Sequence, residues 1–146
     1  SVMQPFFYDK RESRRWDTEE KFVDYLNKSA DVDWWFKNGD RDAIYFAVPY
    51  GPKGTPLSFY VDFVVMMRDG RVGLFDPHGI HLGDFSAKSD GLRAYIARLQ
   101  EQGRSAFGGI VANTDPRGFT GEWMVYDDEG EKKRDGEWES WRLLQL

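Results

Sequence analysis

Two aspartates, Asp62 and Asp76, stand on either side of a predicted turn and have the spacing needed to share chemistry. The turn, Arg68-Asp69-Gly70, matches a three-residue hairpin loop whose last position adopts a left-handed backbone. That loop pairs Met67 with Arg71, and counting back along both strands brings the two aspartates opposite each other, with Cβ atoms about 4.5–5.5 Å apart. A two-residue turn would instead put them on opposite faces.

Neighbouring carboxylates repel each other unless they share a proton, a basic side chain or a bound cation. Mg²⁺ typically takes one or two carboxylates and keeps several waters. We therefore expect Asp62 and Asp76 to hold Mg²⁺ or Mn²⁺. The chain contains no cysteine, so any metal must be held by oxygen or imidazole, and cysteine nucleophiles are excluded. His78 and His81 are its two histidines, and their spacing alone does not make a zinc site.

Two further charged residues are predicted on the inner faces of helices. Glu19 shares a helix face with Phe22 and Leu26, so it points inward and can become a third metal ligand. Lys88 lies one turn before Leu92 on the apolar face of a second helix, from which its side chain can reach the rim of a pocket. The alternative for Lys88 is a side chain that lies along apolar surface with its ammonium group in water.

The elements that must position these residues alternate between helices and strands. Asp17 and Glu20 form a capping box at the start of a first helix that runs to about Lys28. In the strand predicted over residues 57–67 every odd position is apolar, which indicates one buried face, and the even face around Asp62 is largely apolar too. We also predict a helix over residues 86–102 and strands over residues 32–36, 43–48, 71–76, 108–113, 122–126 and 138–144.

This order predicts one α/β domain over residues 1–146, with a central mixed β-sheet flanked by helices. No apolar run approaches the ~20 residues that span a bilayer, and residues 1–10 lack a signal-peptide pattern. We therefore expect a cytoplasmic protein without a membrane partner. The start at Ser1 without an initiator Met suggests a piece excised from a longer protein.

Three stretches carry a resemblance to a known family: FYVDFVVMMRDGRVGLFDPHG around the hairpin, TEEKFVDYLNKSADVDWWFKNGD upstream, and GGIV after the second helix. Together they resemble the PD-(D/E)xK nucleases, in particular the nuclease-like C-terminal domains of type III restriction subunits and related DEAD/DEAH helicases. In that family a Pro-Asp motif and a hairpin lead to (Asp/Glu)-x-Lys. Asp62 matches the first acidic position, Asp76 the second, and Val61 replaces the proline.

The resemblance implies a restriction-endonuclease-like sandwich and an Mg²⁺-dependent endonuclease-like phosphodiesterase. Its implied partners are DNA and a helicase or ATPase domain of the same parent chain. His78 stands where the family has its lysine. Because histidine is shorter and mostly neutral at pH 7, it cannot simply replace that charge, but it can accept a proton from water or ligate a metal. His78 or Lys88 would then be the basic catalytic group, and Glu19 would assist the two aspartates.

Two other interpretations stay open. His78 and the net charge of −5 both favour a catalytically degenerate domain that keeps the nuclease fold and acts as a DNA-binding or docking module. The other is a protein-interaction domain in which Trp34, Trp35 and Trp123 form an exposed apolar patch.

Overall fold

The computed structural model describes residues 15–38, 47–50, 57–77, 85–115, 120–127, 138 and 140–146. Two helices and eight strands lie within them. In chain order they are α1 (Arg15–Lys28), β1 (Val32–Lys37), β2 (Ala47–Tyr50), β3 (Leu57–Tyr60), β4 (Phe63–Met67), β5 (Val72–Pro77), α2 (Phe85–Glu101), β6 (Ala106–Asn113), β7 (Trp123–Tyr126) and β8 (Trp141–Leu143).

Six strands form one mixed sheet in the order β1-β4-β5-β6-β7-β8. β5 and β6 are parallel and are connected through α2, whereas the other neighbours in this sheet are antiparallel. β2 and β3 form a separate antiparallel pair, and β2 contacts α2. The predicted α/β fold with a central mixed sheet is therefore confirmed.

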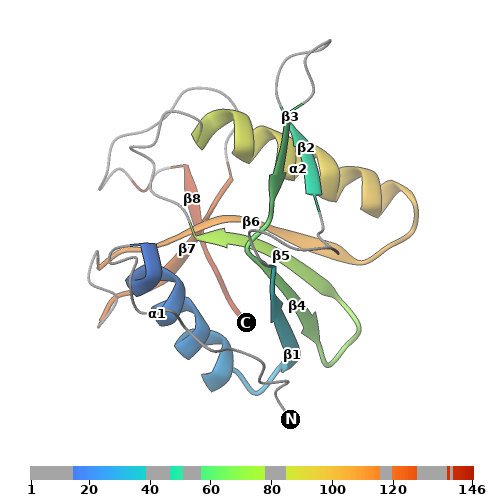
Figure 1. The fold of residues 1–146 in the computed structure, drawn as a ribbon. Helices are drawn as coiled ribbons and strands as arrows, with labels where there is room; N and C mark the ends of the chain where they lie inside the picture. The colour runs from blue at the N-terminus through green and yellow to red at the C-terminus, as the bar shows by residue number, and fades with distance from the viewer. Residues whose placement is uncertain are drawn as a thin grey trace.

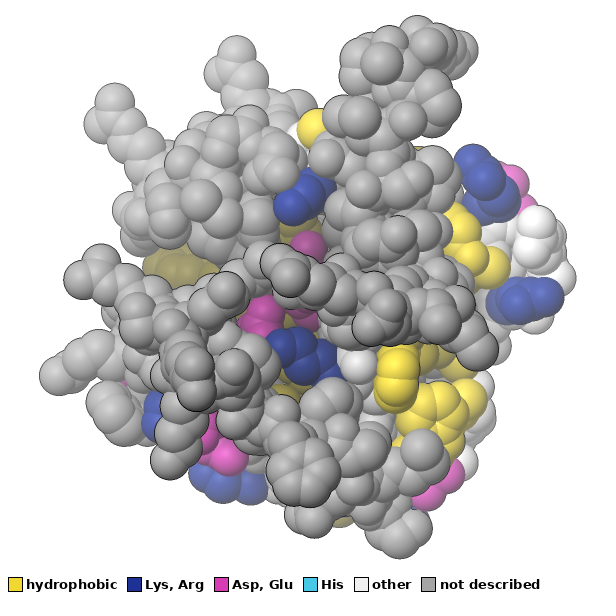
Figure 2. Space-filling model, in the orientation of Figure 1, with side chains coloured by type: hydrophobic (Ala, Val, Ile, Leu, Met, Phe, Trp, Pro, Cys, Tyr) yellow, Lys and Arg dark blue, Asp and Glu magenta, His cyan; other side chains and the backbone are white. Residues whose placement is uncertain are grey.

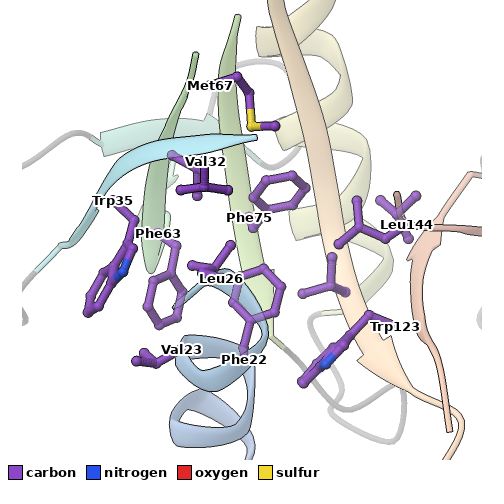
Figure 3. Packing of buried hydrophobic residues seen from close by; sticks show 13 residues of the cluster. Phe22, Val23, Leu26, Val32, Trp35, Phe63, Met67, Phe75, Trp123 and Leu144 are labelled. Atoms are coloured by element: carbon purple, nitrogen blue, oxygen red, sulfur yellow. The ribbon is translucent and has the colours of Figure 1, made fainter. Parts of the chain in front are cut away.

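The two helices pack on opposite faces of the sheet (Figure 1). Phe22 of α1 contacts Phe63 and Phe75 edge-on, with ring centroids 5.2 and 5.7 Å away (Figure 3). On the other face Leu92 of α2 packs in one core with Leu74, the residue next to Phe75 in β5. Because successive residues of a strand point to opposite faces, β5 supplies side chains to both cores.

Helix α1 begins at Arg15, so Asp17 lies inside the helix and the prediction of Asp17 as its N-cap was wrong. An aspartate remains favourable in the first turn, where the free backbone N–H groups concentrate positive potential. The capping signal therefore located the start of the helix to within two residues without identifying its first residue.

The strand predicted over residues 57–67 is broken in its middle. β3 ends at Tyr60, the chain bends at Asp62, and β4 begins at Phe63. Val61 packs in the core beneath α2, whereas Phe63 packs in the core beneath α1. The prediction that the odd positions of residues 57–67 all share one face was therefore wrong. The bend at Asp62 turns the chain over, and the apolar pattern does not reveal the bend because apolar residues are needed in both cores.

The tryptophan patch is also ruled out by burial. Trp35 and Trp123 are only 4% and 6% exposed, and both belong to the core beneath α1. The indole N–H of Trp35 donates a hydrogen bond of 2.9 Å to Oδ1 of Asn27.

Neither helix in the described part of the chain is long and apolar enough to cross a bilayer.

Candidate functional site

The turn between β4 and β5 has the predicted three-residue geometry. Gly70 has a φ of 89°, and its N–H donates to the carbonyl of Met67 at 3.0 Å. Met67 N–H in turn donates to the carbonyl of Arg71 at 2.9 Å. The two-residue alternative is excluded because Val64 pairs with Leu74, as the longer loop requires.

Asp69 stabilises this turn from the solvent side. Its Oδ1 accepts a hydrogen bond from the backbone N–H of Arg71 at 3.0 Å, and its Oδ2 accepts one from Nε of Arg71 at 2.8 Å. These hydrogen bonds, the backbone one first, hold the pKa of the Asp69 carboxyl below its ordinary value. Both hydrogen bonds favour the ionised form of the Asp69 carboxyl, which bridges the turn to Arg71.

This register carries Asp62 and Asp76 to the same end of two neighbouring strands. The last direct pair between β4 and β5 is Phe63 with Phe75, and each aspartate lies one residue beyond it. Asp62 is 4% exposed and Asp76 is 3% exposed. The backbone holds both firmly: Asp62 accepts a 2.7 Å hydrogen bond on its carbonyl from Asn38 N–H, and Asp76 pairs with Ile110 in β6.

The N-terminal half of α2 covers this end of the sheet. α2 leads from the end of β5 back to the start of β6, so it runs antiparallel to both strands. From the Leu74–Leu92 core, one step along the same face of β5 leads to Asp76, about 6.6 Å on. Three residues back along α2, about 4.5 Å, lies Ser89, which is 1% exposed and whose Oγ has no hydrogen-bond partner. Lys88 precedes it and is partly buried.

On the other face, Glu19 of α1 forms an ion pair with Lys37, the last residue of β1: Nζ of Lys37 donates to Oε2 of Glu19. The side chains of Glu19 and Lys37 are 7% and 14% exposed. Lys37 is directly opposite Phe63, so its backbone lies beside Asp62 in the sheet. Glu19 points inward as predicted, and its partner is a lysine that the sequence analysis did not single out.

The sequence nevertheless contained a signal for Lys37. It follows Trp35 by two residues, so the two share a face of the strand, and a large aromatic marks that face as buried. A lysine at that position needs an anionic partner, because burying an unpaired charge is costly. Figure 2 shows acidic side chains next to Lys or Arg side chains near the middle of the side of the molecule that it draws.

Besides Glu19, three of the predicted site residues come together in the fold. Asp62, Asp76 and Lys88 come to the same end of the sheet, whereas His78 lies outside the described residues. Within the described ranges no three His, Cys, Asp or Glu side chains are grouped closely enough to hold one metal ion. The candidate site therefore consists of Asp62 and Asp76 at adjoining strand ends, with the Glu19–Lys37 ion pair next to the Asp62 end.

Comparisons with known proteins add one finding. No curated protein and no solved structure matches this chain. The family model for the YagJ family matches residues 9–118, which is more than half of the chain and includes Glu19, Lys37 and both aspartates. The chain therefore belongs to the YagJ family.

Proposed function

We propose that this chain is an Mg²⁺-dependent nucleic-acid phosphodiesterase domain of the PD-(D/E)xK type, with a restriction-endonuclease-like sandwich fold. The observation that carries the proposal is the register of the β4–β5 hairpin, which sets two buried aspartates at adjoining strand ends. The resemblance further suggests DNA as the substrate and a helicase or ATPase domain of the same parent chain as the partner.

The order of elements supports the proposal at the level of the fold. A first helix, an aromatic strand, a hairpin with one aspartate just before its first strand and one within its second, a second helix and a Gly-Gly strand follow one another as the resemblance implies. These elements lie as neighbours in one sheet, with a helix on each face. Function depends on the site rather than on this arrangement, so the aspartates carry the argument further than the fold does.

Asp62 and Asp76 fit a hard divalent cation because both carry carboxylate oxygens and both are buried at adjoining strand ends. Two carboxylates suffice for Mg²⁺, whose other positions are taken by water and by substrate oxygens. When bound, the ion supplies positive charge that polarises the phosphate and lowers the pKa of water. Asp62 and Asp76 would fix the position of the ion, and its positive charge would offset the repulsion between the two carboxylates.

The reaction is the hydrolysis of a phosphodiester. The oxygen of a water molecule forms a bond to phosphorus, the bond from phosphorus to one sugar oxygen breaks, and that oxygen takes up a proton. The attacking water loses a proton to His78, which stands at the lysine position of the motif, or to solvent. Lys88, on the part of α2 that covers Asp76, is the second basic residue available to the phosphate.

The alternative is a catalytically degenerate DNA-binding or docking module. The specific observation that favours it is His78 in place of the motif lysine, together with a net charge of −5. A degenerate domain would retain the fold and the aspartate pair but would leave DNA intact.

A plasmid-nicking assay separates these functions. We expect the wild-type protein to nick DNA in Mg²⁺ and not in EDTA, and we expect an Asp62→Asn/Asp76→Asn variant to lose at least about a hundredfold in rate. Asp24→Asn, the same change at an exposed position of α1, is the matched control and should nick like wild type. DNA binding without nicking would support the docking module, and neither activity would contradict both.

A further inference from the structure

The Glu19–Lys37 ion pair occupies a position where stability alone does not account for it. Both side chains are largely buried, and the pair bridges α1 to the last residue of β1. Removing two charges from water costs several kcal/mol per ion, and well-packed apolar residues often stabilise such a place equally well. The burial of the Glu19–Lys37 pair therefore indicates that its charges have a role besides stability.

Its location suggests an answer. Lys37 lies opposite Phe63, the residue that immediately follows Asp62, and the next backbone N–H, that of Asn38, donates to the carbonyl of Asp62. These two contacts place the end of β1 directly beside Asp62, just before the start of β4. A lysine side chain is long and carries three donors, so from the α1 face Lys37 can reach a phosphate oxygen bound at the end of the sheet beside Asp62.

We propose that Lys37, held by Glu19 at the Asp62 end of the sheet, is the cation that contacts the substrate phosphate, in place of the motif lysine that His78 replaces. This inference rests on the proposed function. The ammonium group would offset the negative charge that accumulates on the phosphate oxygens as water attacks. Glu19 is a positioning residue: it directs the ammonium group and does not itself touch the substrate.

The first test measures binding of a short, fluorescently labelled DNA duplex in Ca²⁺ or EDTA, so that cleavage does not interfere. Lys37→Gln should weaken binding by about tenfold, because it removes a charge-assisted hydrogen bond. The slope of log K against log salt should become shallower by about one phosphate contact, which a purely structural lysine would not change. Lys37→Arg should retain most of the affinity.

Two further variants control for folding and for net charge. Glu19→Gln/Lys37→Gln removes both charges together, so that no buried glutamate is left unpaired. The double variant should remain folded by circular dichroism and should lose as much DNA affinity as Lys37→Gln. Lys28→Gln makes the same charge change at an exposed position near the end of α1 and should bind DNA like wild type.

The outcomes separate this inference from the proposed function. If Mg²⁺ binding and nicking are absent but the DNA affinity and salt slope still depend on Lys37, the nuclease proposal fails and the phosphate contact stands. If the folded double variant binds DNA with wild-type affinity and slope, or if wild type binds no DNA, the role of Lys37 is overturned. A loss no greater than that of Lys28→Gln overturns it as well.

Discussion

Glu19 and Lys37 illustrate how a single buried pair sets the energetics of the candidate site. Replacing one partner leaves the other charge in a nearly water-free position, whereas replacing both leaves two neutral groups that can still hydrogen-bond. We expect Lys37→Gln alone to lower the free energy of unfolding by about 3 kcal/mol, and Glu19→Gln/Lys37→Gln to lower it by much less. Urea denaturation measures both, and equal losses would show that the glutamate left behind by Lys37→Gln carries no penalty as an unpaired charge.

Tyr25 links α1 to the C-terminal residues through its hydroxyl group. The hydroxyl donates to the carbonyl of Leu144 and accepts from the N–H of Leu146, each at 3.1 Å. Burial raises the pKa of Tyr25 above its ordinary value of 10.0, against the lowering effect of the Leu146 N–H. Folding therefore favours the protonated phenol.

The direction of this pKa shift gives a pH dependence. Stability contributed by Tyr25 is fully present below pH 10 and is lost as the pH rises from there through the folded pKa, because the unfolded chain releases the proton first. Tyr25→Phe should cost about 1–2 kcal/mol at pH 7 through the two lost hydrogen bonds and should flatten the alkaline fall in stability. Thermal melts between pH 8 and 11 test this, and an equally steep fall in Tyr25→Phe would refute it.

Among the secondary-structure elements, two glycines with positive φ differ in how much room there is for a side chain. A Cβ at Gly70 would meet nothing within 4 Å, whereas a Cβ at Gly108 would lie 2.1 Å from the backbone carbonyl oxygen of Leu74. Gly70→Ala should therefore cost only the backbone strain, about 1–2 kcal/mol. Gly108→Ala should separate β6 from β5 and cost about 4 kcal/mol or more. Comparable losses for the two variants would contradict this account of the β5–β6 contact.

The hairpin shows what could be predicted from the sequence. Loop length and Gly70 together determine the register, so the pairing of Val64 with Leu74 followed from local rules alone. The bend at Asp62 could not be predicted in this way. Apolar residues continue through it without interruption, and only their distribution between two cores distinguishes Val61 from Phe63.

The partner of Glu19 was beyond local rules for another reason. Glu19 was predicted to point inward from helix periodicity, but its contact with Lys37 depends on how α1 folds back across β1. Helix periodicity gives the face of a helix and not the residue it meets on a different element. The alternation of β1 is sufficient to predict that Lys37 shares a buried face with Trp35.

At the scale of the whole molecule, the connectivity gathers the chemistry at one end of the sheet. α1 leads into β1 and α2 leads into β6, and each helix runs antiparallel to the strand that follows it, so the N-terminal half of each helix lies near the same sheet end (Figure 1). Glu19 and Lys88 come from those halves, and Asp62 and Asp76 come from the strand ends between them. The opposite end holds the hairpin turn that sets their register.

Calorimetric titration of Mg²⁺ and Mn²⁺ into the purified protein shows whether Asp62 and Asp76 together form one divalent-metal site. We expect a single binding event in wild type and in Asp24→Asn, and its loss in both Asp62→Asn and Asp76→Asn. Absence of binding in wild type, or binding that survives either aspartate substitution in a folded variant, would contradict the paired-carboxylate site.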